Sequence, residues 1–141
     1  MAQRIARPIH LVVAGVLVAG LFVQFFLAGM GVFSGPAEFA THRDFGYGLT
    51  LLPVVLIVTS LLGRMGRWQT IAAAVMLGQF ILQSVLVLQR DSVPAIAALH
   101  PVNGVLILLF ATWLARDAWR VWQSRSQPSS AEPMAPEAPT G

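Results

Sequence analysis

The sequence predicts an all-α protein: a transmembrane four-helix bundle of up-down-up-down topology with internal duplication of a helical hairpin. Of its 141 residues, 56% are hydrophobic and 11% are charged, whereas an ordinary globular chain has about 25% charged residues. Four apolar stretches each have roughly the 20 residues that a bilayer crossing requires. The second and fourth begin with similar phrases around a histidine, which indicates that one hairpin occurs twice.

Each apolar stretch is expected to form one membrane-spanning helix. The approximate ranges are 9–33, 41–62, 69–88 and 94–115. The first stretch follows Arg4 and Arg7, as a secretory signal would, but it exceeds the roughly 7–15 apolar residues of a signal peptide. We therefore expect it to be a retained helix. Because short connections favour antiparallel neighbours, the four helices should form one domain over residues 1–123.

The remaining residues, 124–141, differ in composition from this domain. They are rich in Ser, Pro, Ala and Glu, and they contain too little apolar surface to fold. The sequence predicts that they form a disordered cytoplasmic tail.

The arginines predict the orientation of the helices. Seven of the nine lie at the N-terminus, in the second connection or at the C-terminal end: Arg4, Arg7, Arg64, Arg67, Arg116, Arg120 and Arg125. The first and third connections contain only Arg43 and Arg90. Since positive charge favours the cytoplasmic side, we expect a multi-pass protein of the inner (plasma) membrane with both termini in the cytoplasm.

Two phrases carry the candidate site, His42-Arg-Asp-Phe-Gly46 and His100-Pro-Val-Asn-Gly104. In a helix, positions i and i+4 share one face, so each histidine should lie beside bare backbone. A second repeated motif lies upstream, where Gln24-Phe-Phe-Leu27 and Gln79-Phe-Ile-Leu82 precede the two phrases. Hairpins related by an axis along the membrane normal would turn the two histidines toward each other.

Two facing imidazoles near the outer interface are an arrangement for binding haem b. Each would bind the iron at about 2 Å, which places the coordinating nitrogens about 4 Å apart. Gly46 and Gly104 would leave space beside the porphyrin because they have no side chain. Arg43 near the outer rim is expected to pair with a propionate or to orient a ligating imidazole.

The phrase around His42 resembles the start of the second helix in one half of haem A synthase, where a carboxylate precedes a His-Arg pair. In that family a second histidine begins the fourth helix, where His100 stands here. The resemblance implies paired axial ligands at His42 and His100, with Glu38 as a catalytic or proton-handling carboxylate. That family has eight helices and a carboxylate three residues before the histidine, whereas this chain has four helices and a spacing of four residues. Residues 5–120 also resemble small uncharacterised bacterial four-helix membrane proteins.

The sequence thus supports a haem-binding membrane protein that serves electron transfer or haem handling, with a redox partner or other membrane subunits beside it. The alternative is a non-enzymatic accessory subunit, or a pocket for a quinone or another small molecule. The pocket would be lined by Gln24, Gln79, Gln83 and Asn103.

Several other classes of function are not supported. The chain has no cysteine, which excludes disulfides, thiolate metal sites and iron–sulfur clusters. Its arginines form no surface interleaved with aromatic residues, which argues against nucleic acid as a partner. No catalytic residues are assigned. The third histidine, His10, is expected to be an interfacial residue without a partner.

Overall fold

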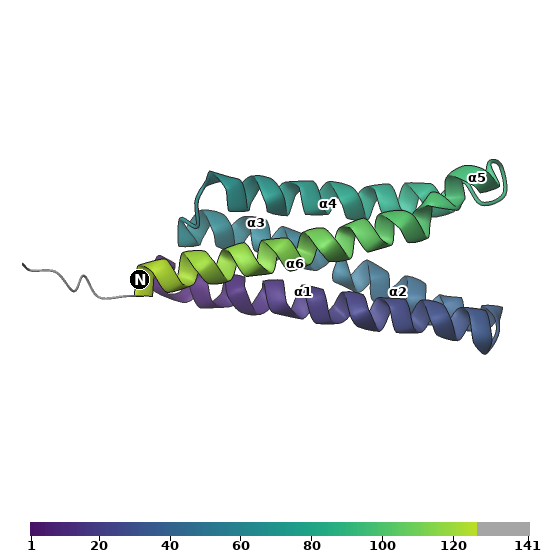
Figure 1. Ribbon diagram of the computed structural model, residues 1–141, viewed down its shortest axis with the longest axis horizontal. Coiled ribbons are helices and arrows are strands. Elements are labelled where there is room, and N and C mark those ends of the chain that lie inside the picture. The colour runs from purple at the N-terminus through teal and green to yellow at the C-terminus, as the bar shows by residue number, and fades with distance from the viewer. Residues whose placement is uncertain (127–141) are drawn as a thin grey trace, which may run out of the picture.

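The computed structural model describes residues 1–126, and these form helices joined by short turns (Figure 1). The elements are α1 (Ala2–Phe33), the 3-10 helix η1 (Pro36–Glu38), α2 (Phe39–Leu49), α3 (Leu51–Gly63), α4 (Arg67–Leu88), α5 (Pro94–Ala97) and α6 (Leu99–Ser126). The all-α prediction is therefore confirmed. Most of the predicted tail lies outside the described residues, and its first three residues continue helix α6.

Four rods make up the bundle: α1, the α2–α3 pair, α4 and α6, each antiparallel to the one before (Figure 1). α1 packs against α3 and α6, and α4 packs against the same two helices. Within the described chain, α1 therefore lies diagonally across from α4, and α3 lies diagonally across from α6. We call the end with Met1 and the 64–66 turn the terminal end, and the end with η1 and the 89–93 turn the loop end.

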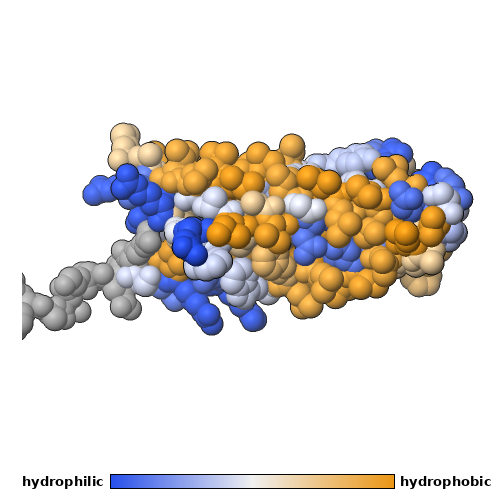
Figure 2. All heavy atoms as spheres, turned by 90° about the horizontal axis from the view of Figure 1, so that it is seen from above, coloured by the Kyte–Doolittle hydropathy of each residue, from blue (hydrophilic) through white to orange (hydrophobic). Residues whose placement is uncertain are grey.

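The core is a narrow column of apolar side chains along the bundle axis. Its fully buried members come from all four rods: Leu17, Leu56, Met76, Ile107 and Leu114. Many other large apolar side chains are exposed, and on the face shown in Figure 2 they form a belt between two hydrophilic ends. Four helical segments are long and apolar enough to cross a membrane, as a multi-pass membrane protein requires.

The helix bounds differ from the predicted ranges at several places, among them the break between α5 (Pro94–Ala97) and α6 (Leu99–Ser126) within the predicted helix 94–115. α1 begins at Ala2 and α6 continues to Ser126, so both helices extend beyond their apolar stretches into segments that contain arginine. The predicted helix 41–62 is interrupted at Thr50. There Pro53 has no N–H to donate to the Leu49 carbonyl, and the Gly46 carbonyl accepts hydrogen bonds from both the hydroxyl and the N–H of Thr50, at 3.1 and 3.2 Å.

The structure supports the duplicated hairpin. A proline followed six residues later by a histidine and ten residues later by a glycine occurs at 36–46 and again at 94–104. In both copies the proline begins a short helical turn, η1 or α5, at the loop end. Exchanging one hairpin for the other preserves the packing of the four rods. The two hairpins are thus related by a pseudo-two-fold axis along the bundle.

Candidate functional site

His42 and His100 meet on the bundle axis at the loop end. His42 lies in the first turn of α2, and His100 is the second residue of α6. Their ring centroids are 6.1 Å apart and their planes are inclined by 64°. Within residues 1–126, α2 packs on α1, η1 and α3 but not on α6. The two rings therefore connect diagonally opposite helices, as the sequence spacing predicts.

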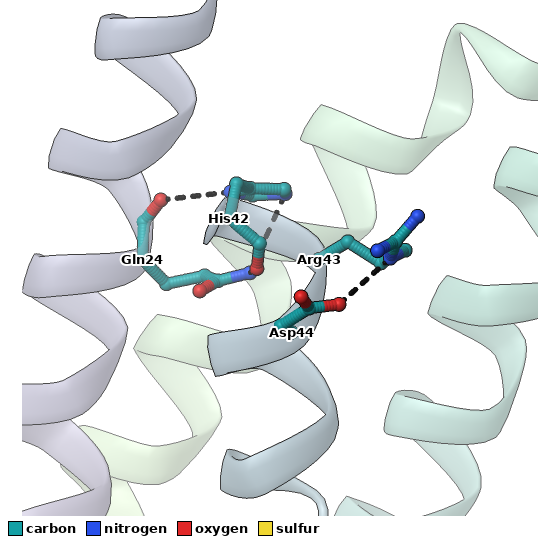
Figure 3. Close-up of polar contacts among 4 residues, drawn as sticks. All are labelled: Gln24, His42, Arg43 and Asp44. Carbon is teal, nitrogen blue, oxygen red and sulfur yellow. Dashed lines mark hydrogen bonds and ion pairs between the residues drawn. The ribbon is translucent and has the colours of Figure 1, made fainter. Parts of the chain in front are cut away.

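Each histidine forms a pair of reciprocal hydrogen bonds with a glutamine of the preceding helix. His42 Nδ1 lies 3.1 Å from the Gln24 carbonyl oxygen, and Gln24 Nε2 donates to the His42 carbonyl at 2.8 Å (Figure 3). His100 Nδ1 lies 3.1 Å from the Gln83 carbonyl, and Gln83 Nε2 donates to the His100 carbonyl at 2.9 Å. The two halves of the site thus have the same bonding scheme.

These bonds determine which ring nitrogen carries the hydrogen. A carbonyl oxygen can only accept, so Nδ1 must be the donor in both histidines. In a neutral imidazole the lone pair is then on Nε2, the atom that would bind a metal. His42 Nε2 has one long contact of 3.4 Å, to Gln24 Nε2. In the described part of the chain, no group hydrogen-bonds to His100 Nε2.

The structure corrects the pairing of the glutamines. The repeated motif matched Gln24 with Gln79, but the partner of His100 is Gln83, one helical turn further along α4. The two glutamines lie 18 and 17 residues before their histidines. The backbone carbonyl of Gln79 instead accepts a hydrogen bond from Asn103 Nδ2 at 3.2 Å. The repeated Gln-Phe pattern was therefore misleading, because Gln79 and Gln83 lie on the same face of the helix.

Gly46 and Gly104 accommodate the glutamine amides. A Cβ atom on Gly46 would lie 2.7 Å from Gln24 Nε2, and one on Gly104 would lie 3.4 Å from Gln83 Nε2. The space that the sequence analysis assigned to a planar ligand therefore holds these two amide groups. The bare glycine backbone allows each glutamine to reach the histidine one turn above.

One glutamine has an unsatisfied oxygen and the other does not. Gln83 Oε1 accepts a hydrogen bond from Asn103 Nδ2 at 2.7 Å. Gln24 Oε1 is buried and has no hydrogen-bond partner among the described residues. The reason lies in the sequence, because Phe45 stands in the first phrase where Asn103 stands in the second. The first half of the site thus contains a buried polar atom whose hydrogen-bonding capacity is unused.

The charged side chains near His42, those of Arg43, Asp44 and Glu38, are exposed to the outside of the bundle. Arg43 Nε forms an ion pair with Asp44 Oδ1 at 2.8 Å, and both side chains are mostly exposed. Figure 3 shows this pair on the opposite side of His42 from Gln24. Glu38 is exposed at the end of η1. The aromatic ring beside His42 is that of Phe39, packed edge-on with centroids 6.3 Å apart, a contact that the sequence analysis missed.

The expectation for His10 was wrong. Its side chain is fully buried near the terminal end, where Nε2 donates to Gln69 Oε1 at 3.1 Å and Nδ1 lies 2.9 Å from Thr59 Oγ1. Gln69 Nε2 in turn donates to Asp117 Oδ2 at 2.6 Å. The repeat contained a signal for this network, since Gln69 follows His10 at the same distance as Gln83 follows Gln24.

The arrangement at the loop end can offer two nitrogen ligands to one metal from opposite sides. Within residues 1–126, no cluster of three or more His, Cys, Asp or Glu side chains forms a metal site. A metal between His42 and His100 would therefore need further ligands from another molecule, such as the four pyrrole nitrogens of a porphyrin.

Comparison with known proteins gives one match. A family of unknown function (DUF6220) matches residues 24–90, a segment that contains Gln24, His42 and Gln83 but ends before His100. No curated protein and no solved structure matches. The family match agrees with the resemblance to uncharacterised membrane proteins, whereas the likeness to haem A synthase stays an expectation. Over residues 24–90 the chain is similar to this uncharacterised family.

Proposed function

We propose that this protein is an integral membrane protein that binds haem b between His42 and His100. In this proposal the haem lies near the outer face of the inner membrane and serves electron transfer or haem handling. The observation that supports it is the contact of the two rings on the bundle axis, with centroids 6.1 Å apart.

This distance suits bis-histidine ligation. Two imidazoles that each bind one iron at about 2 Å have centroids about 6 Å apart, because each nitrogen lies about 1 Å from its own ring centroid. The rings also come from helices that run in the same direction, so they approach from opposite sides at the same depth. His42 and His100 would therefore be able to hold a haem iron between them.

The hydrogen bonds at Nδ1 also fit this role. A metal-binding histidine commonly donates its other N–H to a carbonyl or carboxylate, which fixes the tautomer and the orientation of the ring. The carbonyls of Gln24 and Gln83 are such partners. They would hold both Nε2 atoms in the form that binds iron.

A porphyrin would need the space that the glutamine amides occupy. Both amides are at the ends of flexible side chains, and Gly46 and Gly104 add no bulk of their own. Turning the amides away would break the bonds that Gln24 Nε2 and Gln83 Nε2 donate to the histidine carbonyls, whereas Gln24 Oε1 has no hydrogen bond to lose among the described residues. The backbone carbonyls that orient the two rings do not depend on the position of these amides.

When bound, the haem would supply a one-electron iron couple. The chain would bind the iron through His42 and His100 and would exclude water with the apolar core below them. The arginine-poor loop end would face outward by the positive-inside rule. That side would be accessible to a redox partner or to another membrane subunit.

The test is an absorption spectrum of detergent-purified protein, expressed with ample haem and then titrated with it. We expect a Soret band and the sharp visible bands of low-spin, six-coordinate iron. His42→Ala and His100→Ala should each lose this spectrum. Thr41→Ala and Leu99→Ala, which change the neighbouring exposed residues, should keep it. A wild-type protein that stays colourless and binds no added haem would contradict the proposal.

One observation favours the alternative of an accessory subunit without haem. At the histidine pair, the glutamine–histidine hydrogen bonds join neighbouring helices, α1 to α2 and α4 to α6. If holding helices together is their only role, His42→Asn and His100→Asn should keep assembly, and no variant should change a haem spectrum. A quinone bound beside Gln24 and Gln83 would instead be detected by titrating the protein with a soluble quinone.

A further inference from the structure

A groove at the terminal end lies between α1 and α6, far from the histidine pair. Its volume is about 470 Å³, and it combines an apolar part with a basic part. Leu11, Gly15 and Ala115 line the apolar part, whereas Arg116, Arg120 and Gln123 line the basic part. The groove is open to the outside of the bundle, where a membrane protein meets lipid.

In the described part of the chain, no acidic side chain forms an ion pair with the arginines of the basic part. Arg116 and Arg120 are exposed and lie one turn apart on the same face of α6. Among the described residues, the ion pairs of Arg43 and Arg90 lie at the loop end, away from the groove. The carboxylate between the two groove arginines, Asp117, accepts a hydrogen bond from Gln69 in the bundle interior. The arginines are therefore available to an anion.

The apolar part is continuous with this charge and is open. A Cβ atom on Gly15 would meet no other atom within 4 Å, so the helix surface is indented there. Trp119 completes the lining with half of its side chain exposed. Tryptophan is enriched at the level of the lipid headgroups. The groove thus passes from an interfacial, basic rim to an apolar channel.

We propose that this groove binds an anionic phospholipid. Arg116 and Arg120 bind the headgroup phosphate, with Gln123 as a further hydrogen-bond donor, and one acyl chain lies over Gly15 between Leu11 and Ala115. Basic pockets between transmembrane helices are suited to anionic lipid headgroups. The apolar channel favours a lipid over free phosphate, because phosphate alone would leave the channel unfilled. This proposal is independent of haem binding.

Native mass spectrometry of the full chain in detergent would test it, with phosphatidylglycerol and phosphatidylcholine of equal chain length. We expect a preference for phosphatidylglycerol that inorganic phosphate does not displace. The double variant Arg116→Gln/Arg120→Gln should weaken phosphatidylglycerol binding by about 30-fold, the size expected for two arginines near a lipid surface. The control Arg4→Gln/Arg67→Gln removes the same charge from the same end but outside the groove, and it should keep wild-type binding.

Gly15→Leu tests the apolar channel without a change of charge. The new side chain extends into open space, so the bundle should fold normally while acyl-chain binding decreases. An equal loss of binding in both arginine variants would show attraction by diffuse charge and would overturn the proposal. Displacement of the lipid by inorganic phosphate, or unchanged lipid binding in Gly15→Leu, would overturn it as well.

Discussion

At each end of the bundle, two polar residues from equivalent positions of the two hairpins meet on the axis, but the two pairs differ in burial and in hydrogen bonding. At the loop end, His42 and His100 from diagonal rods meet in a half-buried ring contact. At the terminal end, His10 and Gln69 from the other two rods meet in a fully buried hydrogen bond. His10 has both ring nitrogens within hydrogen-bond distance of a partner, whereas among the described residues His100 is hydrogen-bonded through Nδ1 alone. At the terminal end both nitrogens of the histidine are hydrogen-bonded, whereas at the loop end Nε2 of His100 can still bind a metal.

The burial of His10 explains why both of its ring nitrogens are hydrogen-bonded. A polar group in an apolar interior costs free energy unless it is hydrogen-bonded. His10 on α1 bonds to Thr59 on α3 and to Gln69 on α4, and Gln69 reaches Asp117 on α6. One chain of bonds thus connects all four rods. At the loop end each glutamine–histidine pair connects two rods, α1 with α2 or α4 with α6. The contact between the rings of His42 and His100 connects the two pairs.

The largest expected effect contrasts these two ends. His10→Leu should lower the free energy of unfolding of the ligand-free protein by about 2–3 kcal/mol, because it leaves Gln69 Oε1 buried without a donor. His42→Leu, at a half-buried position, should cost less than about 1 kcal/mol, since Gln24 keeps its own bond to the backbone. Reversible unfolding in mixed detergent micelles measures both values. Equal losses would show that the loop end is as much a structural tie as the terminal end.

A smaller effect should separate the two halves of the histidine site. Gly46→Ala places a Cβ atom where Gln24 Nε2 now lies, so it should break the Gln24–His42 bond at a cost of about 1 kcal/mol. In Gly104→Ala the new Cβ atom would lie 3.4 Å from Gln83 Nε2, an ordinary contact distance. This variant should leave the free energy of unfolding nearly unchanged. In a Gln24→Ala background, Gly46→Ala should cost almost nothing. A cost that persists in that background would mean that Gly46 is needed by the backbone itself.

Hydropathy and spacing predicted the bundle and the meeting of His42 with His100, but they missed the His10 network. The position of a residue in an apolar stretch indicates how deep it lies in the membrane, and a repeated motif indicates that its two copies lie at the same depth. Neither reports the rotation of a helix about its own axis, which packing decides. His10 was therefore taken as an interfacial residue, although α1 turns it toward the core. The same limit led to the wrong glutamine, because Gln79 and Gln83 share a face and only the helix register selects between them.

The smallest expected effect concerns the arginines at the two ends. At the terminal end, Arg7 Nε donates to the Gly63 carbonyl at 2.9 Å and so connects α1 to the end of α3. At the loop end, Arg43 pairs with its neighbour Asp44 in an exposed position, and exposed pairs contribute little. Arg7→Gln should therefore lower the free energy of unfolding by about 1 kcal/mol, whereas Arg43→Gln should leave stability unchanged.

Arg43→Gln also tests the role that the sequence analysis gave to this residue. Because the guanidinium lies on the opposite side of His42 from Gln24 (Figure 3), we expect the variant to bind as much haem as the wild type, measured by Soret absorbance per protein. A lower haem content with unchanged stability would mean that Arg43 leaves Asp44 to pair with a propionate when haem binds. The loop end would then rearrange on binding, while the hydrogen-bonded terminal end stays fixed.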